Sequence, residues 1–312
     1  DVVFKDLVLA VTDEQHRFGV KQRSRLGQGK EIVPHVLVMS ATPIPRTLGF
    51  VLYGDLDISV VKGLPGGRQP IETYTASSAD DRRIYDLIDK QIGEGRQIYI
   101  VCPMIEDTRE SDLLSVKALY DELKTKVFAG RNVGLLHGSM KTKEKDDVMD
   151  SFMKGETDIL VSTTVIEVGV DNPNATIMLI QNAERFGLAQ LHQLRGRIGR
   201  GSHRSICILK SDSDQKLAVE RLKTLCKSSD GFVIAEKDLQ LRGIGDFFGT
   251  RQHGIPDLKI ANLYTDTQLL EESRKALMQL LKEDPFITSP GNRKMIPHIK
   301  HRFIGQEGNI GL

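Results

Sequence analysis

The chain has 312 residues, of which 39% are hydrophobic and 27% charged, and this balance excludes wholesale disorder and predicts one or two packed cores. The net charge of +1 excludes a generally basic nucleic-acid binder, so any such contact must come from local clusters of basic residues. Three widely spaced cysteines, and the lack of a ~20-residue apolar run or a signal peptide, predict a cytoplasmic protein without disulfides or a membrane span.

Short apolar runs rich in β-branched residues alternate along the chain with stretches whose apolar positions repeat at helical spacing. The predicted strands are 7–11, 35–39, 98–101, 133–136, 159–162, 177–180 and 206–209. The predicted helices are 80–92, 112–128, 142–153, 215–227, 232–241 and 268–282. Continuous apolar strands that alternate with helices are typical of βαβ units, so we expect an α/β protein with an open parallel sheet.

A stretch rich in Gly and Pro at 63–73 is the best candidate for a linker between two sheets. Only two predicted strands precede it, which is too few for a stable α/β domain, so we expect the chain to begin within a domain. The expected parts are the remnant of a first lobe (1–72), a second lobe (73–212), a helical hairpin with the segment after it (213–265), and a C-terminal helix with a mostly irregular tail (266–312).

Polar residues follow the first two predicted strands, where open α/β sheets place their ligand-handling groups. At the first strand, Asp13 and Glu14 can divide two tasks of nucleotide hydrolysis. One carboxylate would hold Mg²⁺ through water, and the other would orient or deprotonate the attacking water. An acidic helix start is an equally good interpretation of this pair alone. After the second strand, Ser40 and Thr42 can bond to an acidic neighbour or simply cap a proline-shaped turn.

The sequence VSTTVIEVGVD follows the strand at 159–162 and places hydroxyl and backbone N–H groups where they suit phosphate oxygens. Its residues of interest are Thr163, Thr164, Glu167, Gly169 and Asp171. Because the motif begins directly at a strand end, we expect it to border a ligand site.

Four arginines crowd the sequence QLRGRIGRGSHR, and two of them, Arg197 and Arg200, stand three residues apart. If the segment is helical, both guanidinium groups leave one face, which suits the charge that develops on a transferred γ-phosphate. The structural alternative is a solvated basic helix face, against which the glycines of the segment argue. A phosphate-binding G-x-x-x-x-G-K-[ST] string does not occur in the 312 residues.

Four segments, DEQH, SATPIPRT, VSTTVIEVGVD and QLRGRIGR, resemble in this order motifs II, III, V and VI of superfamily-two helicases. YIVCPMIE and LLHGSM resemble further motifs of the second lobe. The resemblance implies two RecA-like lobes with ATP and Mg²⁺ in the cleft between them. It implies that Asp13 holds Mg²⁺ through water, that Glu14 serves the attacking water, and that Arg197 and Arg200 are arginine fingers.

The same resemblance assigns supporting roles to other residues. It places Gln193, Gly169 and Asp171 at the nucleotide site. The residues that it assigns to DNA contact or coupling in the two lobes are Ser40, Thr42, His137, Thr163 and Thr164.

Within this superfamily, residues 1–281 are most similar to the RecG-type double-stranded DNA translocases, above all through EKDLQLRGIGDFFGTRQHGIPDLKIANL. The part RGIGDFFGTRQHG resembles the motif that couples the ATP site to the grip on duplex DNA, which implies roles for Arg242, Arg251 and Gln252. The expected partner is branched double-stranded DNA, such as replication forks and Holliday junctions, and the expected state is a monomer.

Without a phosphate-binding loop, this chain alone is expected to bind ATP weakly and not to hydrolyse it. Two alternatives stay open. One is the motor of a transcription-repair coupling factor, whose motifs II and III are similar. The other is a non-catalytic DNA-binding module derived from a helicase.

Overall fold

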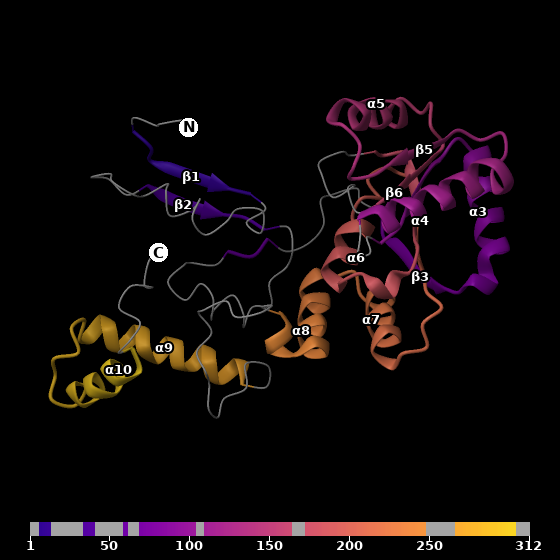
Figure 1. Ribbon diagram of the computed structural model, residues 1–312. Helices are drawn as coiled ribbons and strands as arrows, with labels where there is room; N and C mark the ends of the chain where they lie inside the picture. The colour runs from indigo at the N-terminus through magenta and orange to yellow at the C-terminus, as the bar shows by residue number, and fades with distance from the viewer. Residues whose placement is uncertain are drawn as a thin grey trace. The chain divides into compact units, whose positions relative to one another are not determined.

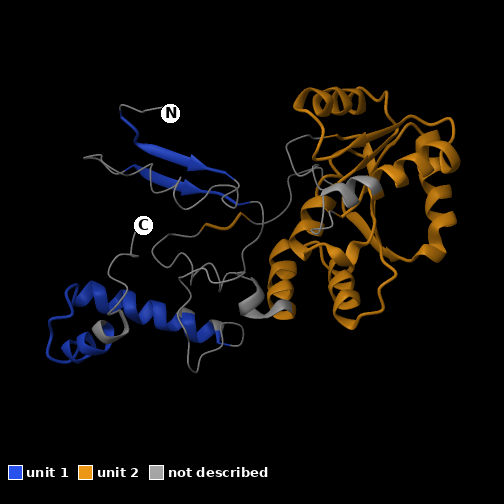
Figure 2. Cartoon of the chain, viewed as in Figure 1, with its two compact units in different colours: residues 1–41, 47–54, 254–312 blue, residues 42–46, 55–253 orange. Residues whose placement is uncertain are grey.

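The computed structural model describes residues 6–13, 34–40, 59–61, 69–103, 109–163, 172–247 and 266–303. The chain divides into two compact units, which Figure 2 distinguishes by colour. The first comprises residues 1–41, 47–54 and 254–312, and the second comprises residues 42–46 and 55–253. The larger sheet and most of the buried core belong to the second unit.

A six-stranded parallel sheet forms the centre of the second unit, with its strands in the order β3-β8-β7-β4-β6-β5. The strands are β3 (Ile71–Ala76), β4 (Gln97–Val101), β5 (Val133–Leu136), β6 (Ile159–Ser162), β7 (Ala175–Ile180) and β8 (Ser205–Lys210). Parallel neighbours require crossover connections, which the helices supply. The predicted α/β class and parallel sheet are confirmed.

Helices cover both faces of this sheet (Figure 1). One face packs against α3 (Asp81–Gly93) and α4 (Arg109–Glu122), which continues as the π-helical turn η3 (Leu123–Val127). The other face packs against α5 (Thr142–Met153), α6 (Leu188–Arg195), α7 (Lys216–Lys227) and α8 (Gly231–Phe247). Two short 3-10 helices, η2 (Ser78–Asp80) and η5 (Ala183–Arg185), begin the connections after β3 and β7.

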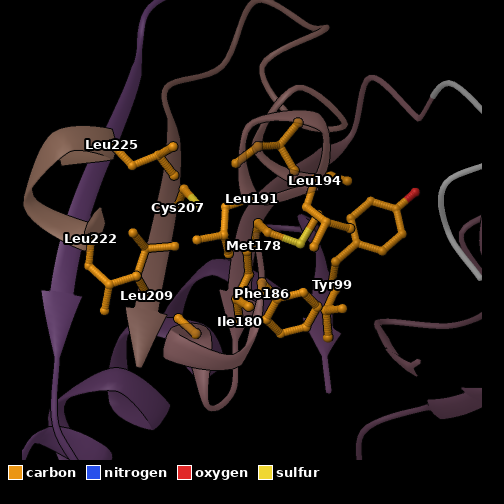
Figure 3. Packing of buried hydrophobic residues seen from close by; sticks show 14 of the residues in the cluster. Tyr99, Met178, Ile180, Phe186, Leu191, Leu194, Cys207, Leu209, Leu222 and Leu225 are labelled. Carbon is orange, nitrogen blue, oxygen red and sulfur yellow. The ribbon is translucent and has the colours of Figure 1, made fainter. Parts of the chain in front are cut away.

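Alternate side chains of each strand enter two separate hydrophobic clusters. In β4, Ile98 and Ile100 pack toward α3 and α4, whereas Tyr99 and Val101 pack toward α5 and α6, and all four are fully buried. Figure 3 shows the second cluster, in which Tyr99 lies among leucine and methionine side chains of the neighbouring elements. Burial on both faces explains why the strands appear in the sequence as continuous apolar runs.

Among the strands of the described residues, β3 is the one that the sequence does not predict. Its sequence, IETYTA, alternates polar and apolar residues, and none of its side chains is buried, because β3 is an edge strand that pairs only with β8. Its first residues also fall within the stretch at 63–73 that is rich in Gly and Pro. The predicted boundary between residues 72 and 73 therefore falls inside this strand.

In the first unit, β1 (Leu9–Thr12) and β2 (His35–Val38) form a two-stranded parallel sheet. Apolar side chains on and beside these strands are largely exposed, although parallel sheets are usually covered on both faces. The unit also contains α9 (Thr267–Glu283), η6 (Arg293–Met295) and α10 (Ile296–Phe303). The expectation of a mostly irregular tail is wrong for residues 293–303, where Pro297 occupies the first turn of α10, a position that tolerates proline.

Among the helices of the described ranges, none combines the length and apolarity that crossing a membrane requires.

Candidate functional site

The carboxyl edge of the six-stranded sheet brings two predicted residues together. His137 follows β5 and Thr163 follows β6, and the Thr163 N–H donates a hydrogen bond to the Leu136 carbonyl at 3.2 Å. Because β5 and β6 are parallel neighbours, both residues stand at the same edge. The structure thus places two of the predicted DNA-contacting residues side by side, at the ends of adjacent strands.

Three buried polar atoms at this edge have no hydrogen-bond partner among the described residues. They are Oγ of Ser162, Oγ1 of Thr163 and Nδ1 of His137. A buried polar group without a partner costs about 1–3 kcal/mol, and native structures hold few of them. Hydroxyl groups donate readily to phosphate oxygens, so this edge has the chemistry to accept a phosphate-bearing ligand.

Two lysines, Lys117 and Lys145, and one carboxylate, that of Glu144, lie near His137 at the same edge. Burial lowers the pKa of His137 below its ordinary value, and the nearby ammonium groups of Lys117 and Lys145 lower it further. Lys145 donates from Nζ to the Gly138 carbonyl at 2.9 Å, which holds its charge beside the strand end. Lys117 and Lys145 therefore place positive charge beside His137 at this edge.

These shifts predict that the second unit loses stability in mild acid. His137 and His192 both have folded-state pKa values below 6.5, His192 because of burial and then Arg195. The unfolded chain therefore binds more protons just below pH 6.5, so the free energy of unfolding is constant above that pH and falls as the pH drops. Urea unfolding between about pH 5 and 8 measures this slope.

The substitutions His137→Gln and His192→Gln should each flatten that slope relative to the wild-type chain. A slope that stays unchanged in both variants would contradict the assignment.

The opposite, amino edge of the sheet carries the arginine loop, which we define as residues 196–201. Helix α6 ends at Arg195, and the loop continues from it through hydrogen bonds from the Arg197 N–H to the Leu194 carbonyl at 2.9 Å and from the Ile198 N–H to the Arg195 carbonyl at 3.3 Å. The segment that carries Arg197 and Arg200 is therefore not helical, so the condition under which both guanidinium groups would leave one helix face is not met. Both side chains are half-buried, and Arg200 donates from Nε to the Gly196 carbonyl at 3.2 Å.

Two glycines of this loop are required by its conformation and packing, which the sequence does not show. Gly199 has a φ of +74°, and a Cβ built there would lie 2.7 Å from Cγ1 of Ile71. A Cβ on Gly201 would lie 2.4 Å from the Pro173 carbonyl oxygen. Because the loop is packed tightly between β3 and the segment before β7, packing alone requires glycine at both positions, and these glycines do not favour a catalytic role over a structural one.

Two of the four arginines in the predicted basic cluster bond to other elements of the second unit. Arg195 is 4% exposed, and its Nη1 donates to the carbonyl oxygens of Leu225 at 2.7 Å and Ser228 at 3.0 Å, at the C-terminal end of α7. Burial lowers the pKa of this guanidinium. Arg204 donates from Nε to Oε1 of Glu72 in β3 at 2.6 Å. The cluster is therefore not a single DNA-facing patch.

The buried position of Arg195 was detectable in the sequence. Leu188 and Leu191 precede it at helical spacing, so the 3.6-residue period places Arg195 on the buried face of α6. Gln193, which the resemblance assigns to the nucleotide site, lies half-buried in the same helix.

The predicted helical hairpin is present as α7 and α8. The Asp230 carboxylate accepts a hydrogen bond from the Phe232 N–H at 2.8 Å and thereby caps the start of α8. Lys237 on α8 pairs with Glu220 on α7 at 3.0 Å. Buried leucine and isoleucine side chains join both helices to the core of the lobe.

In the first unit, Asp13 directly follows β1 and Ser40 lies two residues beyond β2. The strands pair in parallel, with Thr12 opposite Val38, so both residues stand at the carboxyl edge of this small sheet, as predicted.

Several predicted residues lie outside the described residues. They are Glu14, Thr42, Thr164, Glu167, Gly169, Asp171, Arg251 and Gln252. Arg242 belongs to α8 by its backbone, and its side chain is likewise outside the description.

Two family models match the chain. The model "Helicase conserved C-terminal domain" matches residues 81–202, which include the arginine loop and the carboxyl edge. The model "ATP-dependent DNA helicase RecG, domain 3, C-terminal" matches residues 228–302.

Curated relatives agree with these matches. The ATP-dependent DNA helicase RecG of Synechocystis sp. is 52% identical over 287 residues, which cover 91% of this chain and 34% of the relative. RecG of Bacillus subtilis is 48% identical over 291 residues, which cover 93% of this chain and 42% of the relative. A solved structure of RecG bound to a three-way DNA junction matches with 44% identity and a TM-score of 0.66, covering 87% of this chain and 34% of that one. The chain thus spans 34% to 42% of the length of these proteins.

Proposed function

Because this chain belongs to the RecG helicase family, we propose that it supplies the second motor lobe and DNA-coupling hairpin of an ATP-dependent translocase that remodels branched double-stranded DNA. The proposed substrates are replication forks and Holliday junctions. The solved structure of RecG bound to a three-way DNA junction supports this substrate class. The monomeric state stays a prediction.

The observation that carries the proposal is the separation of two sets of polar groups on one sheet. Hydroxyl groups, His137 and Lys145 stand at the carboxyl edge, and the arginine loop stands at the amino edge. In the proposed arrangement the first set contacts the DNA backbone, and Arg197 and Arg200 contact the phosphates of ATP. DNA binding and ATP hydrolysis would then take place at opposite edges of the same sheet.

The residues at the first sheet fit a bound Mg²⁺. Asp13 is an exposed carboxylate at the carboxyl end of β1, and Mg²⁺ prefers oxygen ligands, retains several waters and is often held by one or two carboxylates. We therefore assign Asp13 to hold Mg²⁺ through water and Glu14 to orient the attacking water. ATP with its Mg²⁺ would supply the phosphoryl transfer that drives movement. The described residues contain no cluster of three or more metal-ligating side chains.

We also propose that this chain alone binds ATP weakly and does not hydrolyse it, since the 312 residues contain no G-x-x-x-x-G-K-[ST] string.

A salt titration of DNA binding tests the proposal. The purified chain should bind a model three-way junction with an affinity that falls as salt rises, with a log–log slope of about −0.9 for each phosphate contacted. The substitution Lys145→Gln, at the carboxyl edge, should reduce that slope by roughly one contact. Fluorescence anisotropy at several salt concentrations measures both values.

The matched control is Lys154→Gln. Lys145 lies in the first turn of α5, whereas Lys154 is exposed and directly follows the last residue of that helix. A slope near zero, or an equal effect of the two substitutions, would argue against DNA contact at the carboxyl edge.

A further inference from the structure

A cluster of three amide side chains, two of them buried, lies at the amino edge of the second-unit sheet. Its centre is Gln97, the first residue of β4, which is 4% exposed. Its Nε2 donates to the carbonyl oxygens of Phe152 at 2.5 Å and Thr157 at 2.8 Å. Its Oε1 accepts from Nδ2 of Asn172 at 3.1 Å and of Asn174 at 3.3 Å. The Gln97 amide therefore uses both of its donors and both lone pairs of its acceptor.

The two asparagines of this cluster fix a short stretch of backbone. Asn172 is 3% exposed, and its Oδ1 accepts from the Asn174 N–H at 2.9 Å. Asn174 in turn donates from Nδ2 to the Gly95 carbonyl at 2.9 Å and accepts from Nη1 of Arg96 at 2.6 Å. Between them stands Pro173, which is thus held from both sides by side chains bonded to Gln97.

Pro173 is the residue against which the arginine loop rests. The loop comes so close that a Cβ on Gly201 would lie 2.4 Å from the Pro173 carbonyl oxygen and 3.2 Å from its carbonyl carbon. The backbone of Gly201 therefore lies against the Pro173 carbonyl group, with no room for a side-chain atom between them. A shift of Pro173 toward the loop would displace Gly201 and, with it, the adjacent Arg200.

We propose that Gln97 is a positioning residue for the arginine loop, acting through Asn172 and Asn174 on Pro173 and from Pro173 on Gly201. Its two acceptor bonds set the position of Pro173, and its two donor bonds anchor the cluster to the connection between α5 and β6. An effect of Gln97 on ATP hydrolysis would rest on the proposed function of Arg197 and Arg200. The effect of Gln97 on the position of the arginine loop does not depend on that function.

Two substitutions of Gln97 separate positioning from general stabilisation. Gln97→Met has a similar volume and removes all four hydrogen bonds. Gln97→Glu, as the neutral acid, keeps an oxygen that accepts from Asn172 and Asn174 but loses at least one donor bond. Thr157→Val is the matched control, because it removes the 3.0 Å hydroxyl contact with Ser151 at the same edge without touching the asparagines.

The measurement is hydrogen–deuterium exchange of this chain, without ATP or DNA, compared between the peptide that spans the arginine loop and peptides from the β4 and β7 core. Gln97→Met should speed exchange of the Gly196, Arg197 and Ile198 amides roughly tenfold more than exchange of the core. Gln97→Glu should restore most of the loop protection, and Thr157→Val should leave the loop at the wild-type rate relative to the core.

Equal acceleration of loop and core in Gln97→Met, or a Gln97→Glu loop as unprotected as the Gln97→Met loop, would overturn the proposal. Because no nucleotide or DNA is present, this result does not depend on the salt titration. Failure of the proposed function would leave the exchange pattern intact, and failure of the positioning role would leave DNA binding at the opposite edge intact.

Discussion

Replacement of Arg200 by alanine is expected to reduce DNA-stimulated ATP turnover by roughly a thousandfold. The assay requires an enzyme in which this chain is joined to the part of Bacillus subtilis RecG outside the matched region. An arginine finger stabilises the charge on the transferred phosphoryl group more strongly in the transition state than in bound ATP. The loss should therefore fall on kcat, while KM for ATP changes little. Steady-state phosphate release over a range of ATP concentrations measures both constants.

Arg204→Ala is the matched control for Arg200→Ala. Arg204 lies four residues further along, is exposed, and pairs with Glu72 rather than with any part of the arginine loop. It should retain nearly full turnover, because an exposed ion pair contributes little to stability. Turnover that survives in Arg200→Ala, or falls equally in Arg204→Ala, would remove the basis for an arginine finger at this position.

Most of the fold was predictable because burial on both faces leaves a local signature. β4 and β7 are continuous apolar runs, and the helices between the strands repeat their apolar positions at helical spacing. β3 lacked that signature, since an edge strand with exposed side chains is free to carry Glu72 and Tyr74. Its place in the sheet depends on pairing with β8, which lies far along the chain, and no local pattern reports such a pairing.

In the candidate site, too, some features could be predicted from the sequence and others could not. His137 and Thr163 could be placed from the sequence, because the end of a predicted strand fixes the edge at which they stand. The contacts of the arginine loop could not be predicted, because Gly199 meets Ile71 and Gly201 meets Pro173 across long separations in sequence. Without knowledge of those neighbours, the glycines of this basic segment indicate a functional role rather than a packing requirement. Gln97 was missed for the same reason, since its partners come from the last turn of α5, the connection after α5 and the segment before β7.

The substitution Gly201→Ala is expected to destabilise the second unit by roughly 1–3 kcal/mol and to loosen the arginine loop. The added methyl carbon would lie 2.4 Å from the Pro173 carbonyl oxygen, and backbone atoms on both sides must move to relieve that contact. Pro173 cannot yield alone, because the flanking asparagines are bonded to Gln97. Thermal unfolding, followed by circular dichroism, should show a lower Tm. In the joined enzyme, the turnover of Gly201→Ala should fall while junction binding is retained.

Gly93→Ala provides the control for that prediction, because Gly93 is the last residue of α3 and a Cβ there would meet nothing within 4 Å. Alanine favours a helix over glycine, so this variant should be as stable as the wild type or slightly more so. If Gly201→Ala were equally harmless, Pro173 could not be pressing on the loop. The route from Gln97 to Arg200 would then break at its last contact. A loss confined to Gly201→Ala would instead show that hydrolysis depends on where the backbone holds these arginines.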